Sequence, residues 1–381
     1  MNCVILQQPK RLFFGPGCSA RLAEEIAELG LRRIYVVASP TASRHGEALV
    51  ASWRATGALV EVNASVDQEP DIARFEAVLA GARQFAPDGI VGLGGGSPLD
   101  VAKLVAALLD GRQAIRDVFG IGKLLGRGVY LACVPMTAGT GSEVSPNAVF
   151  IDEIERVKKG VISPYLVPDV ALLDPLLTLS VAPSVTAAVG LDALVHCMEG
   201  YANKAAHPAV DFYALEGIRR IGRSLATAVA HGDDIVARTD VMLGAYYGGL
   251  CLGPVNTAGV HALSAPLGGE YRIAHGVANS LLVPHVFRFN LAAMPARYAA
   301  IAIALGVAPA ETVEATAVAG VEQLAALSLA CGIPQRLRDV KIPETALPWL
   351  AKEAIKIQRL LKNNPREITE SDALAIYRSA Y

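Results

Sequence analysis

In the first half of the chain, short apolar runs alternate with segments whose apolar residues recur at helical spacing. Four runs have the length of buried strands, and a helical segment follows each of the first three. The predicted strands span residues 33–38, 58–63, 89–93 and 129–134, and the predicted helices span residues 47–56, 72–85 and 98–109. Because this alternation is typical of βαβ units, we expect a doubly wound, parallel α/β sheet.

Beyond Asp174 the pattern changes. Pro175, Pro183 and a stretch rich in Leu, Thr and Ser interrupt the chain, and the segments that follow are rich in Ala and Leu at helical spacing. Helices are predicted over residues 185–201, 209–230, 235–251, 277–289, 295–305 and 311–331, without a clear strand pattern among them. The sequence therefore predicts an α/β domain over residues 1–177 and an all-helical domain over residues 178–381.

The composition narrows the class of protein. Hydrophobic residues make up 52% of the chain, and the net charge is −2 without a strongly basic stretch, so no nucleic-acid partner is expected. The six cysteines are scattered and form no CxxC pair, which is typical of reduced cysteines in a cytoplasmic protein. No signal peptide is recognisable, and the longest uncharged stretch, 241–269, is too rich in Gly and Pro for a membrane span.

A glycine-rich loop follows the strand predicted at 89–93. Gly94, Gly95, Gly96 and Ser97 lie where that strand ends and the next helix begins, with Asp100 one turn further along. Glycines let a pyrophosphate approach the backbone, and a helix N-terminus offers free N–H groups. The alternative is a plain tight turn, but three consecutive glycines followed by serine favour phosphate binding. The loop is not the GxGxxG fingerprint.

A second polar loop, 135–143, follows the strand predicted at 129–134. It carries Thr137 and Thr140 at the edge of the sheet where ligands of doubly wound folds bind. The alternative is a helix N-terminus at which Thr140 and Glu143 form a capping box. Both interpretations can hold together.

Four residues of the helical half form a candidate metal site. Asp192 and His196 are spaced i, i+4 and so share a helix face, and His261 and His275 lie in later segments. Each residue alone is more often an ordinary core or surface residue. Three imidazoles and one carboxylate together suit iron(II) or zinc, and an open coordination position would polarise a substrate oxygen. His285 is a candidate for orienting the site.

The chain resembles the iron-containing, or group III, alcohol dehydrogenase family. The resemblance rests on GGGSPLDVAK at 94–103, PMTAGTGSEVS at 135–145, GLDALVHCMEGY at 190–201 and the segment 261–290, and it covers almost the whole chain. It implies a dehydroquinate synthase-like architecture with a dinucleotide-binding α/β domain and a helical domain. It also implies a metal held by Asp192, His196, His261 and His275, and cofactor contacts from Ser39, Gly95, Gly96, Ser97, Asp100, Thr137, Thr140 and Lys159.

The activity that this resemblance implies is a metal-dependent, NAD- or NADP-linked alcohol dehydrogenase or carbonyl reductase. Fe²⁺ is the expected metal, the same ligands accept Zn²⁺, and the substrate oxygen would bind at the metal while hydride passes to or from the nicotinamide. A cytoplasmic homodimer acting on a small alcohol, aldehyde or ketone is expected. The alternatives are a metal- and NAD-dependent lyase resembling dehydroquinate synthase, and a non-catalytic homologue that binds nucleotide or metal.

Two positions depart from the family pattern. Many members carry a second histidine four residues after the third metal ligand, with a role in proton relay, and this chain has Ala265 there. Members that prefer NAD often place Asp after the first cofactor strand, and this chain has Ser39. Since serine does not repel a 2′-phosphate as a carboxylate would, both NAD and NADP remain candidates.

Overall fold

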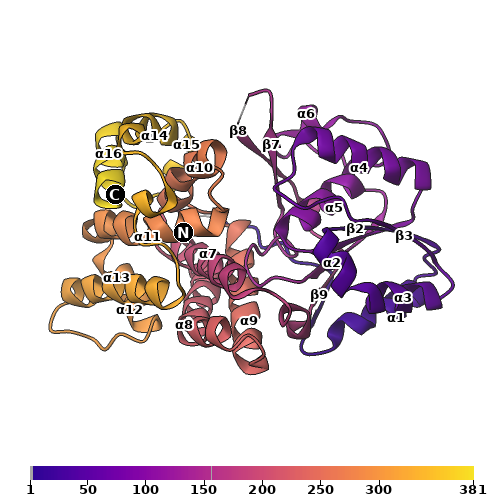
Figure 1. Cartoon of the computed structure of the whole chain (residues 1–381), viewed down its shortest axis with the longest axis horizontal. Helices are drawn as coiled ribbons and strands as arrows, with labels where there is room; N and C mark the ends of the chain where they lie inside the picture. The colour runs from indigo at the N-terminus through magenta and orange to yellow at the C-terminus, as the bar shows by residue number, and fades with distance from the viewer. Residues whose placement is uncertain (1–2, 156) are drawn as a thin grey trace. The chain divides into compact units, whose positions relative to one another are not determined.

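The computed structural model describes residues 3–155 and 157–381, which form two compact units (Figure 1). One unit is Gln7–Val181, and the other combines Ala182–Tyr381 with the N-terminal segment as far as Leu6. The division therefore lies shortly after the predicted join at 177/178. The N-terminal segment was predicted within the α/β domain but groups with the helical unit. The 3-10 helix Pro175–Thr178 spans the predicted join, and its N-cap residue Asp174 accepts hydrogen bonds from Gly17 and Ser19 of the first unit.

A six-stranded parallel sheet forms the first unit, in the order β1-β9-β6-β4-β2-β3. The four predicted strands are confirmed as β2 (Arg33–Ala38), β3 (Leu59–Asn63), β4 (Gly89–Gly94) and β6 (Tyr130–Pro135). Two strands were not predicted, β1 (Arg11–Phe14) and β9 (Val170–Leu173), and each has only four residues. The prediction of a parallel α/β sheet is confirmed.

Helices cover both faces of this sheet (Figure 1). Along β2, Ile34 and Val36 share a core with Trp53, whereas Tyr35 and Val37 share another with Phe75. This alternation follows from the period of a strand, whose successive side chains point to opposite faces. One face carries α1 (Arg21–Glu28), α2 (Pro40–His45) and α3 (Glu47–Ala55), and the other carries α4 (Ile72–Phe85) and α5 (Gly96–Leu108).

A small second sheet was not predicted. It has the order β5-β8-β7, with β5 (Gly120–Ile121) parallel and β7 (Asn147–Asp152) antiparallel to β8 (Val157–Ile162). Its central strand carries Lys158 and Lys159, so it lacks the apolar run by which buried strands are recognised. Short elements complete the unit: α6 (Ile115–Val118) and the 3-10 helices η1 (Cys18–Ala20), η2 (Pro164–Leu166) and η3 (Pro175–Thr178).

From Ala182 onward the regular elements are all helices, as predicted. The longer ones are α7 (Pro183–Tyr201), α8 (Pro208–Ala230), α9 (Ile235–Leu252), α10 (Gly259–Tyr271), α11 (His275–Asn290), α12 (Pro295–Ala304) and α13 (Val313–Ala330). The C-terminal part adds α14 (Leu347–Ala354), α15 (Gln358–Leu361), α16 (Glu370–Ser379) and the 3-10 helices η4 (Leu291–Ala293), η5 (Leu337–Val340) and η6 (Glu344–Ala346).

Among residues 3–155 and 157–381, only α13 is long and apolar enough to cross a membrane by length and composition. A core helix of a globular protein can pass the same test. Gly320 of α13 packs so closely on α12 that an added Cβ would lie 2.5 Å from the Cβ of Ala302. This helix is therefore packed within the second unit.

Candidate metal site and dinucleotide loops

One face of α7 carries three buried polar residues, Asp192, His196 and Glu199. Their spacing is i, i+4 and i+7, which places them above one another on successive turns. Burying two carboxylates and an imidazole on an otherwise apolar helix is costly unless each finds a partner. The contacts of this face therefore indicate what it binds.

Two later helices, α10 and α11, carry the other histidines of this site. His261 lies in the first turn of α10, and His275 is the first residue of α11. Beside His275, an added Cβ on Gly276 would lie only 2.1 Å from the Ala188 carbonyl oxygen, so glycine lets α11 begin directly against α7.

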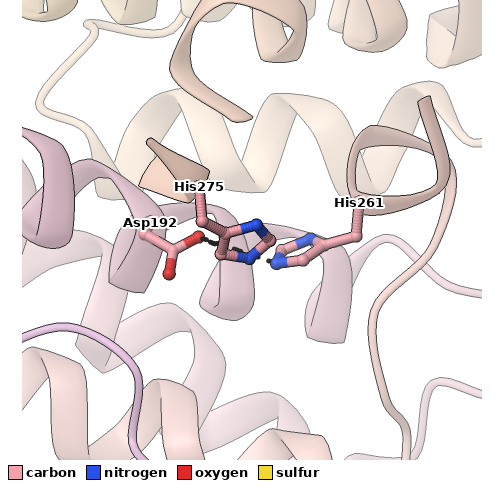
Figure 2. A group of neighbouring side chains, drawn as sticks. All are labelled: Asp192, His261 and His275. Atoms are coloured by element: carbon pink, nitrogen blue, oxygen red, sulfur yellow. Dashed lines mark ion pairs between the residues drawn. The ribbon is translucent and has the colours of Figure 1, made fainter. Parts of the chain in front are cut away.

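The four predicted metal ligands lie together. Figure 2 shows Asp192, His261 and His275 pointing toward one another, and their ligand atoms all lie within 4.8 Å of each other. Asp192 Oδ1 is 3.6 Å from His261 Nε2 and 3.7 Å from His275 Nε2. His196 adjoins this group, because its Nε2 is 3.9 Å from Asp192 Oδ2 and its ring stacks on that of His261 at 4.9 Å. His275 is the most accessible of the four, with 37% of its side chain exposed.

The imidazoles hold Asp192 ionised. Burial alone would raise the pKa of this carboxyl, but His196, His275, His261 and the amide of Asn279 outweigh burial and lower its pKa to about 2. Asp192 therefore carries a negative charge at neutral pH, inside the buried group that it forms with the three histidines.

A buried amide, that of Asn279, contacts three of these four residues. Asn279 Nδ2 donates to Asp192 Oδ1 at 2.6 Å and lies 3.2 Å from both His261 Nε2 and His275 Nε2. The Oδ1 atom of the same amide is buried without a hydrogen-bond partner. Ligand atoms of one carboxylate and two imidazoles thus converge on one point, where a divalent cation would satisfy them together. The residues present fit such a cation.

Two further residues adjoin the predicted ligands and were not predicted, Glu199 and Asn279. Glu199 Oε2 lies 2.7 Å from His261 Nδ1, and Asn279 lies one turn after His275 on α11. A signal for both exists, since Glu199 continues the i, i+4 pair of α7 and Asn279 is spaced i+4 from His275. His285, which was the candidate for orienting the site, bonds instead to Ser379 Oγ at 2.8 Å.

In the first unit, the glycine-rich loop and the second polar loop touch each other. The Met136 amide donates to the Gly94 carbonyl at 2.8 Å, and an added Cβ on Gly96 would lie 2.6 Å from Thr140 Cγ2. Gly95 is the N-cap residue of α5 and no side chain caps that helix. The predicted residues Gly95, Gly96, Ser97, Thr137 and Thr140 are thereby gathered at the ends of the adjacent strands β4 and β6.

Asp100 and Lys103 fasten the second loop to α5. Asp100 accepts hydrogen bonds from Ser142 Oγ and from the Val149 amide. The fully buried Lys103 donates to the carbonyl oxygens of Ser142 at 2.8 Å and Ser145 at 3.0 Å, and burial lowers the pKa of its ammonium group. Both carboxylate oxygens of Asp100 are therefore engaged by the protein itself.

The capping box considered for the second loop is wrong. No helix begins at Thr140; the described residues 136–146 form turns and bends. Gly141 has a φ of 62°, a left-handed conformation that turns the chain away from a helical path. Thr140 Oγ1 accepts instead from the Ser142 amide, while Glu143 is buried, and burial raises the pKa of its carboxyl to about 7.

The two remaining cofactor candidates already have partners. Ser39 lies directly after β2, where its Oγ caps α2 by accepting a hydrogen bond from the Ala42 amide at 3.1 Å. Lys159 Nζ lies 3.0 Å from Asp152 Oδ2 and 2.7 Å from Glu155 Oε1 on the small sheet. Lys159 is thus held by two carboxylates.

Comparison with known proteins agrees with this arrangement. Residues 9–175 match the model of the iron-containing alcohol dehydrogenase family, and residues 186–381 match that of the family's C-terminal part. Long-chain-alcohol dehydrogenase 1 of Geobacillus thermodenitrificans (strain NG80-2) is 39% identical over 96% of this chain and 94% of its own.

Solved structures extend the likeness to the whole fold. A crystal structure of 1,3-propanediol oxidoreductase superposes with a TM-score of 0.96 at 33% identity, covering 100% of both chains. Sulfoacetaldehyde reductase from Bifidobacterium kashiwanohense in complex with NAD⁺ superposes with a TM-score of 0.90 at 28% identity, covering 100% of this chain and 99% of that one. The chain therefore belongs to the iron-containing alcohol dehydrogenase family and is an oxidoreductase of alcohols and carbonyl compounds.

Proposed function

We propose that this oxidoreductase holds a divalent cation at Asp192, His196, His261 and His275. Fe²⁺ is the proposed metal, and Zn²⁺ can replace it. The carrying observation is the convergence of three ligand atoms within 4.8 Å around an ionised, buried carboxylate. When bound, the cation would act as a Lewis acid on an alcohol or carbonyl oxygen, and a nicotinamide dinucleotide would exchange the hydride.

The residues of the chain divide the work. Asp192 and the buried histidines supply charge and fixed lone pairs, and the partly exposed His275 marks the side from which a small alcohol, aldehyde or ketone enters. Ala265 carries no proton-transferring group, so solvent is proposed to exchange the alcohol proton.

We propose that the dinucleotide binds at the glycine-rich loop and the second polar loop, with Gly95, Gly96, Ser97, Thr137 and Thr140 around the pyrophosphate. The uncapped start of α5 supports this proposal, because helix N-termini attract phosphate. Asp100 contributes by holding the second loop. Lys159 joins this set only when its ion pairs with Asp152 and Glu155 open.

Both NAD and NADP are proposed as cofactors. The sulfoacetaldehyde reductase relative binds NAD⁺, and Ser39 in this chain adds no charge that would reject a 2′-phosphate. A cytoplasmic homodimer is also proposed. The scattered cysteines support the location, and β1 supports a dimer because it is an edge strand with an exposed Leu12.

A reductase screen tests the proposal. Metal-stripped protein is reloaded with Fe²⁺ or Zn²⁺ and assayed on aldehydes and ketones with NADH and with NADPH. We expect metal-dependent oxidation of the cofactor, and we expect His261→Ala to lose both bound metal and turnover. Unchanged metal content and turnover in that variant would show that the metal is held elsewhere.

A further inference from the structure

The Glu199 carboxylate is buried and receives three hydrogen bonds. Oε1 accepts from the Val260 amide at 2.6 Å, and Oε2 accepts from the Ala258 amide at 2.9 Å. The third partner is His261 Nδ1, 2.7 Å from Oε2. Because the two amides can only donate, the carboxylate acts here as an acceptor, and Nδ1 brings the proton of the third hydrogen bond.

This hydrogen bond selects one form of the His261 ring. A neutral imidazole carries a single N–H, so a proton on Nδ1 leaves the lone pair on Nε2. Nε2 is the atom that lies 3.6 Å from Asp192 Oδ1, within the group of converging ligand atoms. The buried carboxylate therefore directs the lone pair on His261 Nε2 toward the metal site.

Glu199 also fixes the helix that carries His261. Ala258 is the N-cap residue of α10, and its side chain cannot accept a hydrogen bond. Glu199 replaces that missing cap from α7, by accepting from the amides of Ala258 and Val260. A carboxylate is also favoured at a helix N-terminus by the helix dipole. One side chain thus sets the start of α10 and the orientation of the ring.

We propose that Glu199 is a positioning residue of the metal site, which holds His261 as the Nδ1–H tautomer with Nε2 directed at the cation. This inference rests on the proposed metal site. Carboxylates that orient metal-binding histidines change metal affinity by about 10–100-fold when they are removed. A weakening of this size is expected here.

The substitution Glu199→Gln tests the role while keeping the size of the side chain. An amide has a single acceptor oxygen, so in either orientation its NH₂ group faces a donor that Glu199 accepts from. If it faces His261, it donates to Nδ1, reverses the tautomer and leaves the Ala258 amide without its acceptor. If it faces Val260, the Val260 amide loses its acceptor and the tautomer is kept. We expect the metal-free variant to bind Co²⁺ or Zn²⁺ about 10–100-fold more weakly than the wild type.

The ring itself gives a readout that does not depend on activity. In metal-free protein labelled with ¹⁵N-histidine, the nitrogen shifts of His261 are expected to report Nδ1–H in the wild type. In Glu199→Gln they are expected to move toward Nε2–H when the new NH₂ group faces His261. Glu199→Asp keeps both acceptor oxygens on a shorter side chain, so it should retain Nδ1–H and lose less affinity. Nε2–H in the wild type would overturn the proposal, even if Glu199→Gln does not fold.

Asn203→Ala provides a matched control. It removes the hydrogen bonds from Asn203 Nδ2 to the carbonyl oxygens of Asn256, just before α10, and of Glu199, but it touches neither His261 nor the Glu199 carboxylate. Equal losses of affinity in both variants, with the tautomer unchanged, would mean that Glu199 only stabilises the fold. If His261→Ala loses the metal but folded Glu199→Gln binds it normally, the positioning role fails and the metal site stands. If His261→Ala binds metal like the wild type, the proposed site itself fails.

Discussion

Replacing Gly276 by alanine would place a methyl group where α11 begins against the main chain of α7. The added Cβ would lie 2.1 Å from the Ala188 carbonyl oxygen and 2.6 Å from the Ala188 carbonyl carbon. Ordinary contact begins at 3.4 Å, so the two helices must separate by roughly 1 Å. The obstacle is backbone, which has no alternative rotamer. Overpacking of this kind costs about 1–3 kcal/mol of unfolding free energy.

The same displacement acts on the metal site, because His275 directly precedes Gly276 and begins the helix that moves. A ligand that is shifted by about 1 Å no longer meets the distances that Fe²⁺ or Zn²⁺ requires from imidazole. We therefore expect Gly276→Ala to lower the melting temperature and also to weaken metal binding at least 10-fold. Metal affinity is measured by competition with a chromogenic chelator, and stability by denaturant unfolding of the metal-free protein.

Gly269→Ala is the matched control. Gly269 lies near the end of α10, and an added Cβ there meets nothing within 4 Å. Alanine should be neutral or stabilise the helix by about 0.5–1 kcal/mol. If Gly276→Ala matches Gly269→Ala in stability and in metal affinity, then α11 does not begin as close to α7 as the structure has it, and the reasoning is refuted.

Two further substitutions probe the first unit. Gly96→Ala pushes a methyl group to within 2.6 Å of Thr140 Cγ2, so the KM for the dinucleotide should rise about 10-fold while metal content stays unchanged; a normal KM would show that the two loops need not touch. Asp152 has a pKa lowered from 3.8 to about 2 by its hydrogen bond from Lys159, so its contribution to stability is present above pH 3.8 and is lost as the pH falls toward 2. Asp152→Asn should therefore flatten the acid limb of a stability-against-pH curve, and an unchanged limb would contradict that assignment.

The sequence predicts the parts of this fold that depend on local pattern. Strand β2 and helix α4 begin and end at the residues predicted from their apolar spacing. Each buries a face that its own residues define. Strand β8 was missed because Lys158 and Lys159 interrupt its apolar pattern. The capping box failed because a left-handed Gly141 overrides the local motif.

The candidate site divides in the same way. Asp192 and His196 follow from one helix period, and the resemblance to a family supplies His261 and His275. Glu199 has the right spacing on α7, but its partners are amides some sixty residues further along the chain. No local pattern shows where α10 begins in space, so the part played by Glu199 is readable only from the structure.

Lys103 holds the main chain at the end of the second polar loop and just beyond it. Its ammonium group bonds to the carbonyl oxygens of Ser142, Ser145 and Asn147, which every residue type possesses. The partly exposed side chain at 147 can therefore be varied without removing a hydrogen bond of Lys103, whereas the buried Ser145 leaves no room for a larger side chain. Lys103 thereby fixes the path of the main chain from 142 to 147, and it does so largely through carbonyl oxygens that no substitution within that segment can remove.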